Sequence, residues 1–260
     1  GYIEGRALRP GDIEAAHVHQ LRDHLIDLAR LRGEPGAEIL APVSEACLAL
    51  ADYTRHTGRR LDRVAAALDG ANDDTAKAAG AFVRDEVRGV YRDAERFLHA
   101  SAQRAGWPID LPLPAAARTL SPADHGFHNA LLTDGGRLVF YDFEYAGWDD
   151  PAQMIANACL QPEVPIPGGL RPAFVRDMLA AFPGDSSLRE RLQAVYPVLC
   201  IKWTLIMLNE FMPVDRERRR FAGADPERRR ERQLEKARGH LERARNALAK
   251  PDQLVTAGAP

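Results

Sequence analysis

One short hairpin interrupts a chain whose hydrophobic pattern is otherwise helical. Residues 130–132 and 137–141 are short apolar runs typical of strands, and Asp134-Gly135-Gly136 lies between them. Glycine adopts the positive φ that a tight hairpin turn needs, so this arrangement predicts two antiparallel strands. The rest of the 260 residues must therefore pack as helices beside a single small β element.

Apolar residues at helical spacing predict the remaining elements. The first helix is expected to start at Asp12, a residue type that caps helices, and to end before Gly33 and Pro35. Further helices are expected over residues 37–53, 61–68, 74–104, 172–182, 188–211 and 226–249, with another beginning at 151. The fold class is therefore mainly α with a small β-hairpin.

Charge and cysteine content exclude several classes of protein. With 35 basic and 37 acidic residues and 45% hydrophobic residues, the chain is neither a disordered tail nor a protein built to coat nucleic acid. Cys47, Cys159 and Cys200 stand far apart, which fits reduced, buried thiols and a cytoplasmic location. No signal peptide is visible, and the most apolar stretch, 195–212, contains Lys202, Asn209 and Glu210, which favours a core helix over a membrane span.

Three side chains with oxygen atoms stand where loops meet the predicted strands: Asp124, Asn129 and Asp142. A hairpin brings the residues that flank its strands together, so Asn129 and Asp142 should be neighbours. Carboxylate and amide oxygens suit Mg²⁺, which keeps water ligands that a phosphate can replace. Asp124 could then hold a substrate hydroxyl and accept its proton.

The spacing of these residues resembles that of the aminoglycoside phosphotransferase and choline kinase-like family, relatives of the protein kinases. The run from Asp142 to Gly147 is also similar to the metal-binding strand end of those enzymes. The resemblance implies the C-terminal lobe of a protein-kinase-like fold. It further implies that Asp124 is the catalytic base and that Asn129 and Asp142 hold the Mg²⁺ that bridges the phosphates of ATP or another nucleoside triphosphate.

The same resemblance divides the chain into regions. Residues 1–11 would be a hinge remnant, residues 12–250 the substrate-binding and catalytic lobe, and residues 251–260 a frayed tail. The small nucleotide lobe of such enzymes has no counterpart here, since the first lysine is Lys77 and no glycine-rich phosphate loop is present. We expect the sequence to start inside a longer protein, a phosphotransferase acting on a hydroxyl of a small metabolite or aminoglycoside-like substrate, and this chain alone to be inactive.

One departure from the family pattern leaves a second function open. Family members usually have His-Gly directly before the catalytic aspartate, whereas here Pro122-Ala123 precede Asp124 and His125-Gly126 follow it. Aligning on the displaced pair would put Phe127 in the catalytic place and describe an inactive protein. The Asp124 alignment keeps both downstream spacings and is favoured. The alternative is a non-catalytic, pseudokinase-like binding module.

An acidic and aromatic rim follows the expected metal site. Glu144 and Asp149 could bind an amine of the substrate, and Trp148 could stack on it or simply pack. Asp150 is expected to cap the following helix. Met154 fills a position that is often Asp in the family, which puts one structural hydrogen bond of the fold in question.

Two further patterns favour structural roles. His125 and His128 have H-x-x-H spacing, but no third ligand is suitably spaced, so we expect them to pack in the loop and not to bind zinc. Residues 216–245 carry twelve basic side chains with acidic ones interleaved, and leucine recurs every seven residues from Leu234. This pattern predicts an amphipathic helix packed along its leucine edge, with a nucleic-acid surface as the weaker alternative.

The expected partner is a small-molecule acceptor.

Overall fold

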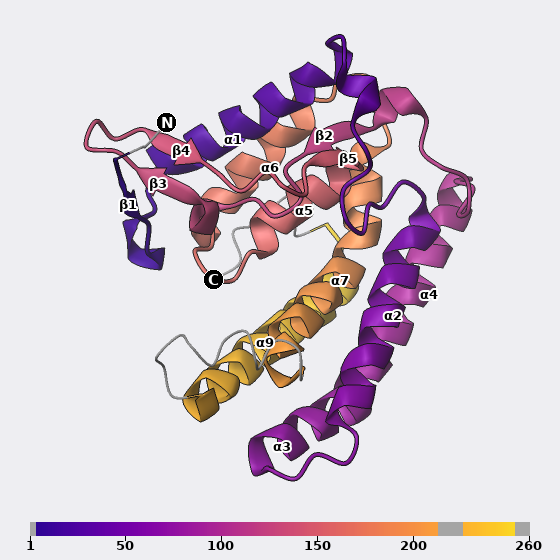
Figure 1. Cartoon of the computed structure of the whole chain (residues 1–260). Helices are drawn as coiled ribbons and strands as arrows, with labels where there is room; N and C mark the ends of the chain where they lie inside the picture. The colour runs from indigo at the N-terminus through magenta and orange to yellow at the C-terminus, as the bar shows by residue number, and fades with distance from the viewer. Residues whose placement is uncertain (1–3, 213–225, 253–260) are drawn as a thin grey trace. The chain divides into compact units, whose positions relative to one another are not determined.

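The computed structural model describes residues 4–212 and 226–252 (Figure 1). Three sequence interpretations extend outside these residues: the start of the hinge remnant, the first arginines of the basic run, and the tail from residue 253. The chain forms two compact units. Unit 1 comprises Gly1–Leu50, Asp110–Gln193 and Asp252–Pro260, and unit 2 comprises Ala51–Ile109 and Ala194–Pro251.

Most of the described residues are helical. The α-helices are α1 (Ala15–Arg30), α2 (Leu50–Leu68), α3 (Asp74–Phe82), α4 (Arg88–Ala105), α5 (Pro151–Leu160), α6 (Arg171–Ala180), α7 (Leu188–Met207) and α9 (Pro226–Ala249). A π-helical turn, η4 (Val83–Val87), joins α3 to α4, and a 3₁₀ turn, η8 (Leu208–Phe211), extends α7. Shorter 3₁₀ turns are η1 (Pro10–Asp12), η2 (Leu31–Gly33), η3 (Ala37–Ile39), η5 (Ala115–Ala117), η6 (Phe127–Asn129) and η7 (Gly168–Leu170).

The strands lie in unit 1 and form two small antiparallel sheets. They are β1 (Arg6–Ala7), β2 (Thr119–Ser121), β3 (Ala130–Leu132), β4 (Leu138–Phe140) and β5 (Gly147–Asp149). One sheet has the order β1-β3-β4 and the other pairs β2 with β5. The predicted hairpin is confirmed as β3 and β4, with Gly136 at φ 74° in the turn. Strand β1, which lies in the expected hinge remnant, is an edge strand that pairs with β3 of that hairpin.

Two helix predictions are wrong at their starts. The helix expected from residue 37 begins only at Leu50, because residues before it run extended beside β5: Trp148 donates its backbone N–H to Ala41 (3.1 Å) and pairs with Pro42. The first helix begins at Ala15, whereas Asp12 closes the preceding 3₁₀ turn by accepting the backbone N–H of Arg9 (2.9 Å). Proline and tertiary pairing override helical spacing in the first case.

A close backbone approach fixes β5 against the segment before α2. A Cβ added to Gly147 would lie 2.1 Å from the carbonyl oxygen of Ala41, so only glycine fits there. Directly after β5, α5 begins at Pro151, and every residue of this helix is buried. Helix α5 contacts α6 and β2, and α1 contacts α6, β2 and β4 (Figure 1). Unit 1 therefore has its core between these helices and the two sheets.

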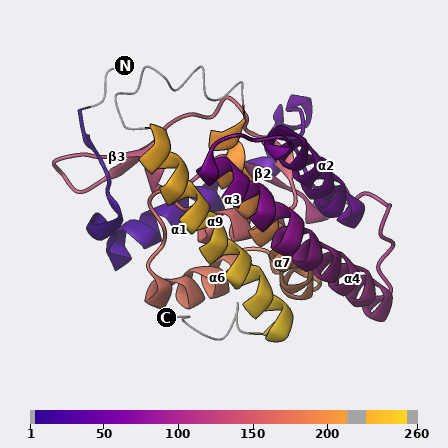
Figure 2. The ribbon, with the colours of Figure 1, turned by 90° about the horizontal axis from the view of Figure 1, so that it is seen from below.

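Unit 2 is helical. The tyrosine hydroxyl of Tyr91 on α4 donates to the carbonyl of Thr54 on α2 (3.0 Å), and α9 contacts α3 and α4 (Figure 2). Buried residues recur along α4 at the expected helical spacing: Val90, Ala94, Leu98 and Ala102. The three cysteines of the chain are buried and form no disulfide, as expected.

Helix α9 has the amphipathic character that the sequence predicts. Leu234 and Leu241 are buried. Arginines of α9 pair with acidic residues of unit 2 at 2.8–3.1 Å, as in Arg229–Glu210, Arg230–Asp73 and Arg238–Glu86. These ion pairs connect α9 to other parts of unit 2.

By length and composition alone, Leu188–Phe211 could span a membrane, but 78% of its most apolar window is buried inside the structure. This burial is what the sequence analysis expects of a core helix.

A buried ion-pair cluster holds the start of α7 to the start of α5 within unit 1. Arg191 contacts Asp150 at 2.9 Å and Asp185 at 2.7 Å, and the three side chains are 3%, 1% and 9% exposed. Asp150 also accepts the backbone N–H of Ala152 (2.8 Å), which confirms it as the cap of α5. Each buried carboxylate thus has a cationic or N–H partner.

We predict that Arg191→Met lowers the free energy of unfolding by about 3–5 kcal/mol, because it leaves two carboxylates buried without their counter-ion. Arg189→Met, an exposed change two residues earlier on α7, is the matched control and should cost about 0.5 kcal/mol or less. Urea titration of both variants measures the difference. Equal stabilities would show that the cluster contributes nothing to the fold.

Candidate active site

Two loops meet because the two sheets end at the same place. The β2–β5 pairing ends at Ser121 opposite Gly147, and the β3–β4 pairing ends at Ala130 opposite Phe140. The loop of residues 122–129 and the loop of residues 141–146 therefore both run from one sheet to the other. The backbone N–H of Tyr141 donates to the carbonyl of Asn129 (3.1 Å), so the loops lie side by side.

In the first loop, the Asp124 side chain is exposed to solvent, and hydrogen bonds hold the backbone of residues 123 and 124. The Asn129 side-chain Nδ2 donates to the carbonyl of Asp124 (2.9 Å), and the backbone N–H of Ala123 donates to Ser121 Oγ (3.2 Å). The Asp124 side chain is 55% exposed, and its Oδ1 lies 3.1 Å from Nε2 of His128. The hydrogen bond from His128 holds the pKa of Asp124 below its usual value, although burial acts against this. Asp124 is therefore ionised at neutral pH and able to accept a proton.

Asn129 and Asp142 carry the oxygens that could hold a metal ion. Asn129 lies opposite Tyr141, so Asp142 is the next residue along the second loop. The Asn129 Nδ2 is committed to Asp124, which leaves Oδ1 available, and within residues 4–212 and 226–252 no donor engages the exposed Asp142 carboxylate. Two such oxygens fit Mg²⁺, which takes few protein ligands and completes its shell with water and phosphate.

Zinc sites in proteins use three or four protein ligands. Among the residues that the structure describes, no group of three His, Cys, Asp or Glu side chains is arranged to hold a metal ion.

Backbone strain is concentrated at the two loops. Within the described residues, the non-glycine residues with positive φ are Glu45 (58°), Ala123 (64°) and Asp142 (67°). Ala123 directly precedes Asp124, and Asp142 is itself a candidate ligand. A non-glycine residue in this region costs of order 1–3 kcal/mol and persists where the surroundings hold it. One of the strained residues, Asp142, is thus a residue that the spacing singled out, and another, Ala123, lies next to Asp124 in the first loop.

His125 takes the packing role that the sequence predicts. The imidazole is 4% exposed, and its Nε2 lies 2.8 Å from the carbonyl oxygen of Met154 on α5, so Nε2 carries the hydrogen. The backbone carbonyl of Met154 thus joins the loop to α5. Burial lowers the pKa of His125 to about 4.

Two of the expected substrate-binding residues are committed to the fold. Asp149 is 1% exposed and accepts hydrogen bonds from the backbone of Cys47 (3.0 Å) and from Gln153 (2.9 Å). Burial raises its pKa to about 6. Trp148 is half-buried, and its indole Nε1 donates to the carbonyl of Ala37 (3.0 Å). The prediction that Asp149 faces the substrate is therefore wrong, since its oxygens point into the interior, and Trp148 is held by packing, the alternative weighed for it.

Glu144 is the remaining residue of the expected rim and is exposed on the second loop. The sequence analysis missed its aromatic neighbours Tyr141, Phe143 and Tyr145, which are 42–52% exposed. Their alternation with Asp142 and Glu144 is the signal that could have revealed them. The second loop therefore offers aromatic faces beside carboxylates.

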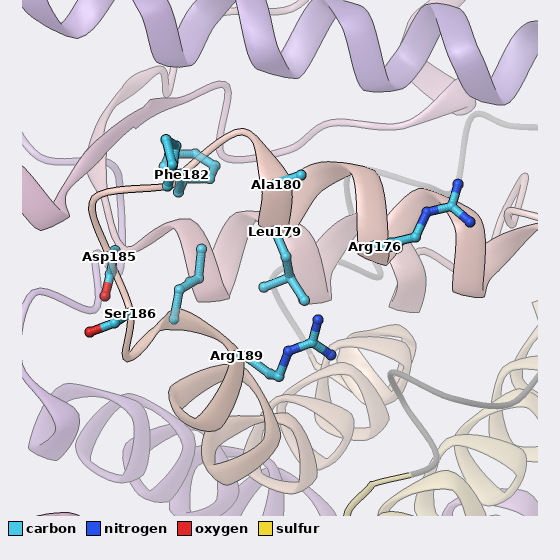
Figure 3. Close-up of a pocket in the computed structure, with 9 residues that line it drawn as sticks. Arg176, Leu179, Ala180, Phe182, Asp185, Ser186 and Arg189 are labelled. Atoms are coloured by element: carbon cyan, nitrogen blue, oxygen red, sulfur yellow. The ribbon is translucent and has the colours of Figure 1, made fainter.

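A separate hollow of about 350 Å³ lies where α6 turns into α7 (Figure 3). Asp185 and Ser186 lie at one end of it and Arg176 at the other, with Leu179 between them (Figure 3). No predicted site residue lines this hollow, so it is distinct from the two loops.

Comparisons with known proteins support the fold. No protein-family model matches the chain, and a search of the curated proteins finds no match. Solved structures do match. The Plasmodium vivax ethanolamine kinase aligns with 95% of this chain and 65% of its own at 18% identity and a TM-score of 0.53. A spectinomycin phosphotransferase, solved with ADP and spectinomycin, aligns with 97% of this chain and 70% of its own at 10% identity and a TM-score of 0.54.

A choline kinase from Cryptosporidium parvum aligns with 96% of this chain and 72% of its own, at 10% identity and a TM-score of 0.53. The chain has the fold of the aminoglycoside phosphotransferase and choline kinase-like family. The resemblance drawn from the loop spacings is thus confirmed at the level of the fold. The chain spans less than two thirds of the ethanolamine kinase and a little more of the other two structures.

We predict that His125 makes the protein sensitive to acid. The pKa of His125 is about 4 in the folded protein and near 6.5 in the unfolded chain. Above pH 6.5 the imidazole is neutral in both states, so its titration does not lower the free energy of unfolding there. As the pH falls from 6.5 to 4, the unfolded state takes up a proton that the folded state does not, at a cost of about 3 kcal/mol. Chemical denaturation at several pH values measures this slope.

His125→Gln, which keeps a side-chain N–H for Met154, should flatten the slope, whatever its stability at pH 7. His99→Gln, a change at an exposed histidine, is the control and should leave the slope unchanged. Parallel slopes for the wild type and His125→Gln would contradict the prediction.

Proposed function

We propose that this chain is the catalytic and substrate-binding lobe of an ATP-dependent phosphotransferase that phosphorylates a hydroxyl group of a small molecule. The observation that carries the proposal is the meeting of Asp124, Asn129 and Asp142 on two adjacent loops of this fold. Proteins that share one fold can have many different functions, so the function is inferred from the residues of the site. There, an ionised carboxylate lies beside uncommitted amide and carboxylate oxygens.

Asp124 would act as the base. As the acceptor oxygen bonds to the γ-phosphorus, its O–H bond breaks and the proton passes to the Asp124 carboxylate, while the bond from phosphorus to the leaving nucleoside diphosphate breaks. Asn129 and Asp142 would hold Mg²⁺, which when bound neutralises charge on the phosphates. Positioning of the acceptor supplies the rest, because phosphoryl transfer needs little covalent help from the protein.

The second loop favours an acceptor that carries an amine. Glu144 supplies an exposed carboxylate, and Tyr141, Phe143 and Tyr145 supply exposed aromatic faces that attract cations. The proposal includes a cytoplasmic location, where ATP is available and free thiols stay reduced.

A binding function without catalysis is the second candidate, and one observation favours it. The His-Gly pair that usually precedes the catalytic aspartate in such enzymes follows Asp124 here, as His125-Gly126, and His125 is buried against α5. A pseudokinase-like module would bind a small molecule at the two loops and transfer nothing.

We predict that Asp124→Asn lowers kcat by about 100- to 10,000-fold, the range expected on losing a general base. The measurement is phosphate transfer by the complete natural protein from Mg-ATP to a panel of small amino-alcohols and aminoglycosides. Asp142→Asn should weaken the magnesium dependence of the same activity, because it removes a negative charge from the metal site.

Asp134→Asn in the turn of the same hairpin is the matched control, since Asp134 is exposed and distant from the two loops along the strands. It should leave turnover unchanged. Wild-type turnover in Asp124→Asn would rule out Asp124 as the base. Acceptor binding without any turnover in the complete wild-type protein would favour the binding module.

A further inference from the structure

The carboxylate of Asp124 is held by a side chain of its own loop. Nε2 of His128 lies 3.1 Å from Asp124 Oδ1, and an ionised carboxylate only accepts, so Nε2 carries the hydrogen. The His128 side chain is 19% exposed and that of Asp124 55%. The better-buried imidazole therefore holds one oxygen of the more exposed carboxylate.

His128 is itself held on two sides. The Tyr141 hydroxyl, from the second loop, donates to the carbonyl of His128 (3.1 Å). Gly126 has φ 152°, a conformation suited to glycine, and a Cβ added there would lie 3.0 Å from Nδ1 of His128. The imidazole thus packs closely over the glycine backbone, and its position depends on the absence of a side chain at residue 126.

We infer that His128 is the positioning residue for Asp124: by donating to Oδ1, it orients the carboxylate so that Oδ2 faces the acceptor hydroxyl. The inference deepens the proposed function and rests on it. A free aspartate rotates about χ2 and exchanges its two oxygens, whereas a hydrogen bond to one oxygen fixes the plane of the carboxylate. Catalysis by a base depends on such orientation, and a small misplacement costs about 100-fold in rate.

This assignment differs from the packing role that the sequence analysis expects of His128. His125 fulfils that role three residues earlier, by donating to Met154 on α5. The two histidines of the loop therefore have different partners: the first joins the loop to the core, and the second joins the loop to its own acidic side chain.

The test compares His128→Leu with His128→Gln in the complete natural protein. Leucine removes the donor, and glutamine places an amide Nε2 near the position of the imidazole Nε2. We expect kcat to fall by about 10- to 100-fold in His128→Leu, with KM for acceptor and nucleotide within about twofold of the wild type. His128→Gln should recover most of the lost kcat. His99→Leu, at an exposed position, is the control for histidine loss.

A second pair of variants displaces the imidazole without removing it. Gly126→Ala pushes a Cβ against Nδ1 of His128 and should lower kcat like His128→Leu. Gly136→Ala, in the hairpin turn, is its matched control, since φ is positive there too (74°) and a Cβ meets nothing within 4 Å. Thermal unfolding of each variant separates a loss of positioning from a loss of folded protein.

The outcomes separate the inference from the proposed function. Wild-type kcat in His128→Leu, together with an inactive Asp124→Asn, would overturn the positioning role and leave the phosphotransferase intact. Full activity of Asp124→Asn would instead overturn the proposed function. A readout without turnover is the long-range ¹H–¹⁵N spectrum of His128. It should show hydrogen on Nε2, protected from exchange in the wild type and exchanging faster in Asp124→Ala, and an Nδ1–H tautomer would refute the pairing.

Discussion

Two antiparallel pairings, β2 with β5 and β3 with β4, determine where the candidate site lies. Each pairs only three residues, yet their ends at Ser121–Gly147 and Ala130–Phe140 fix both loops at once. A shift of either register by one residue would turn the side chains of the moved strand to the opposite face, and a shift of the β3–β4 register would also separate Asn129 from Asp142. Two contacts at β5 and directly after it resist such a shift. They are the close approach of Gly147 to the backbone of Ala41 and the buried ion pair of Asp150 with Arg191.

The two loops show which parts of a candidate site can be predicted from the spacing of residues in the sequence. The hairpin and its glycine turn are local features, so the positions of Asn129 and Asp142 followed from residues 129–142 alone. Strands β2 and β5 could not be predicted, because three residues carry no usable periodicity and their pairing joins segments far apart in the chain. The burial of Asp149 could not be predicted for the same reason, because its hydrogen-bond partner Cys47 lies about a hundred residues earlier in the chain.

Helix prediction succeeded where the apolar stripe faces a continuous core and failed where the backbone had another partner. α9 has the predicted bounds, and two residues of its leucine edge, Leu234 and Leu241, are buried. Residues before α2 have helical spacing, but Pro42 and the backbone of Trp148 draw them into an extended run. The histidines of the first loop gave no signal that would distinguish them, because their roles depend on which atoms of Met154 and Asp124 they meet in three dimensions.

The left-handed backbone of Asp142 has an evolutionary consequence. Glycine adopts this conformation without strain, so Asp142→Gly would relax the backbone, and selection for stability alone would favour it. A lineage with no use for the carboxylate would gain by that replacement. An aspartate at this position therefore costs stability that glycine would recover, so a relative with glycine here would keep the fold and lack the carboxylate.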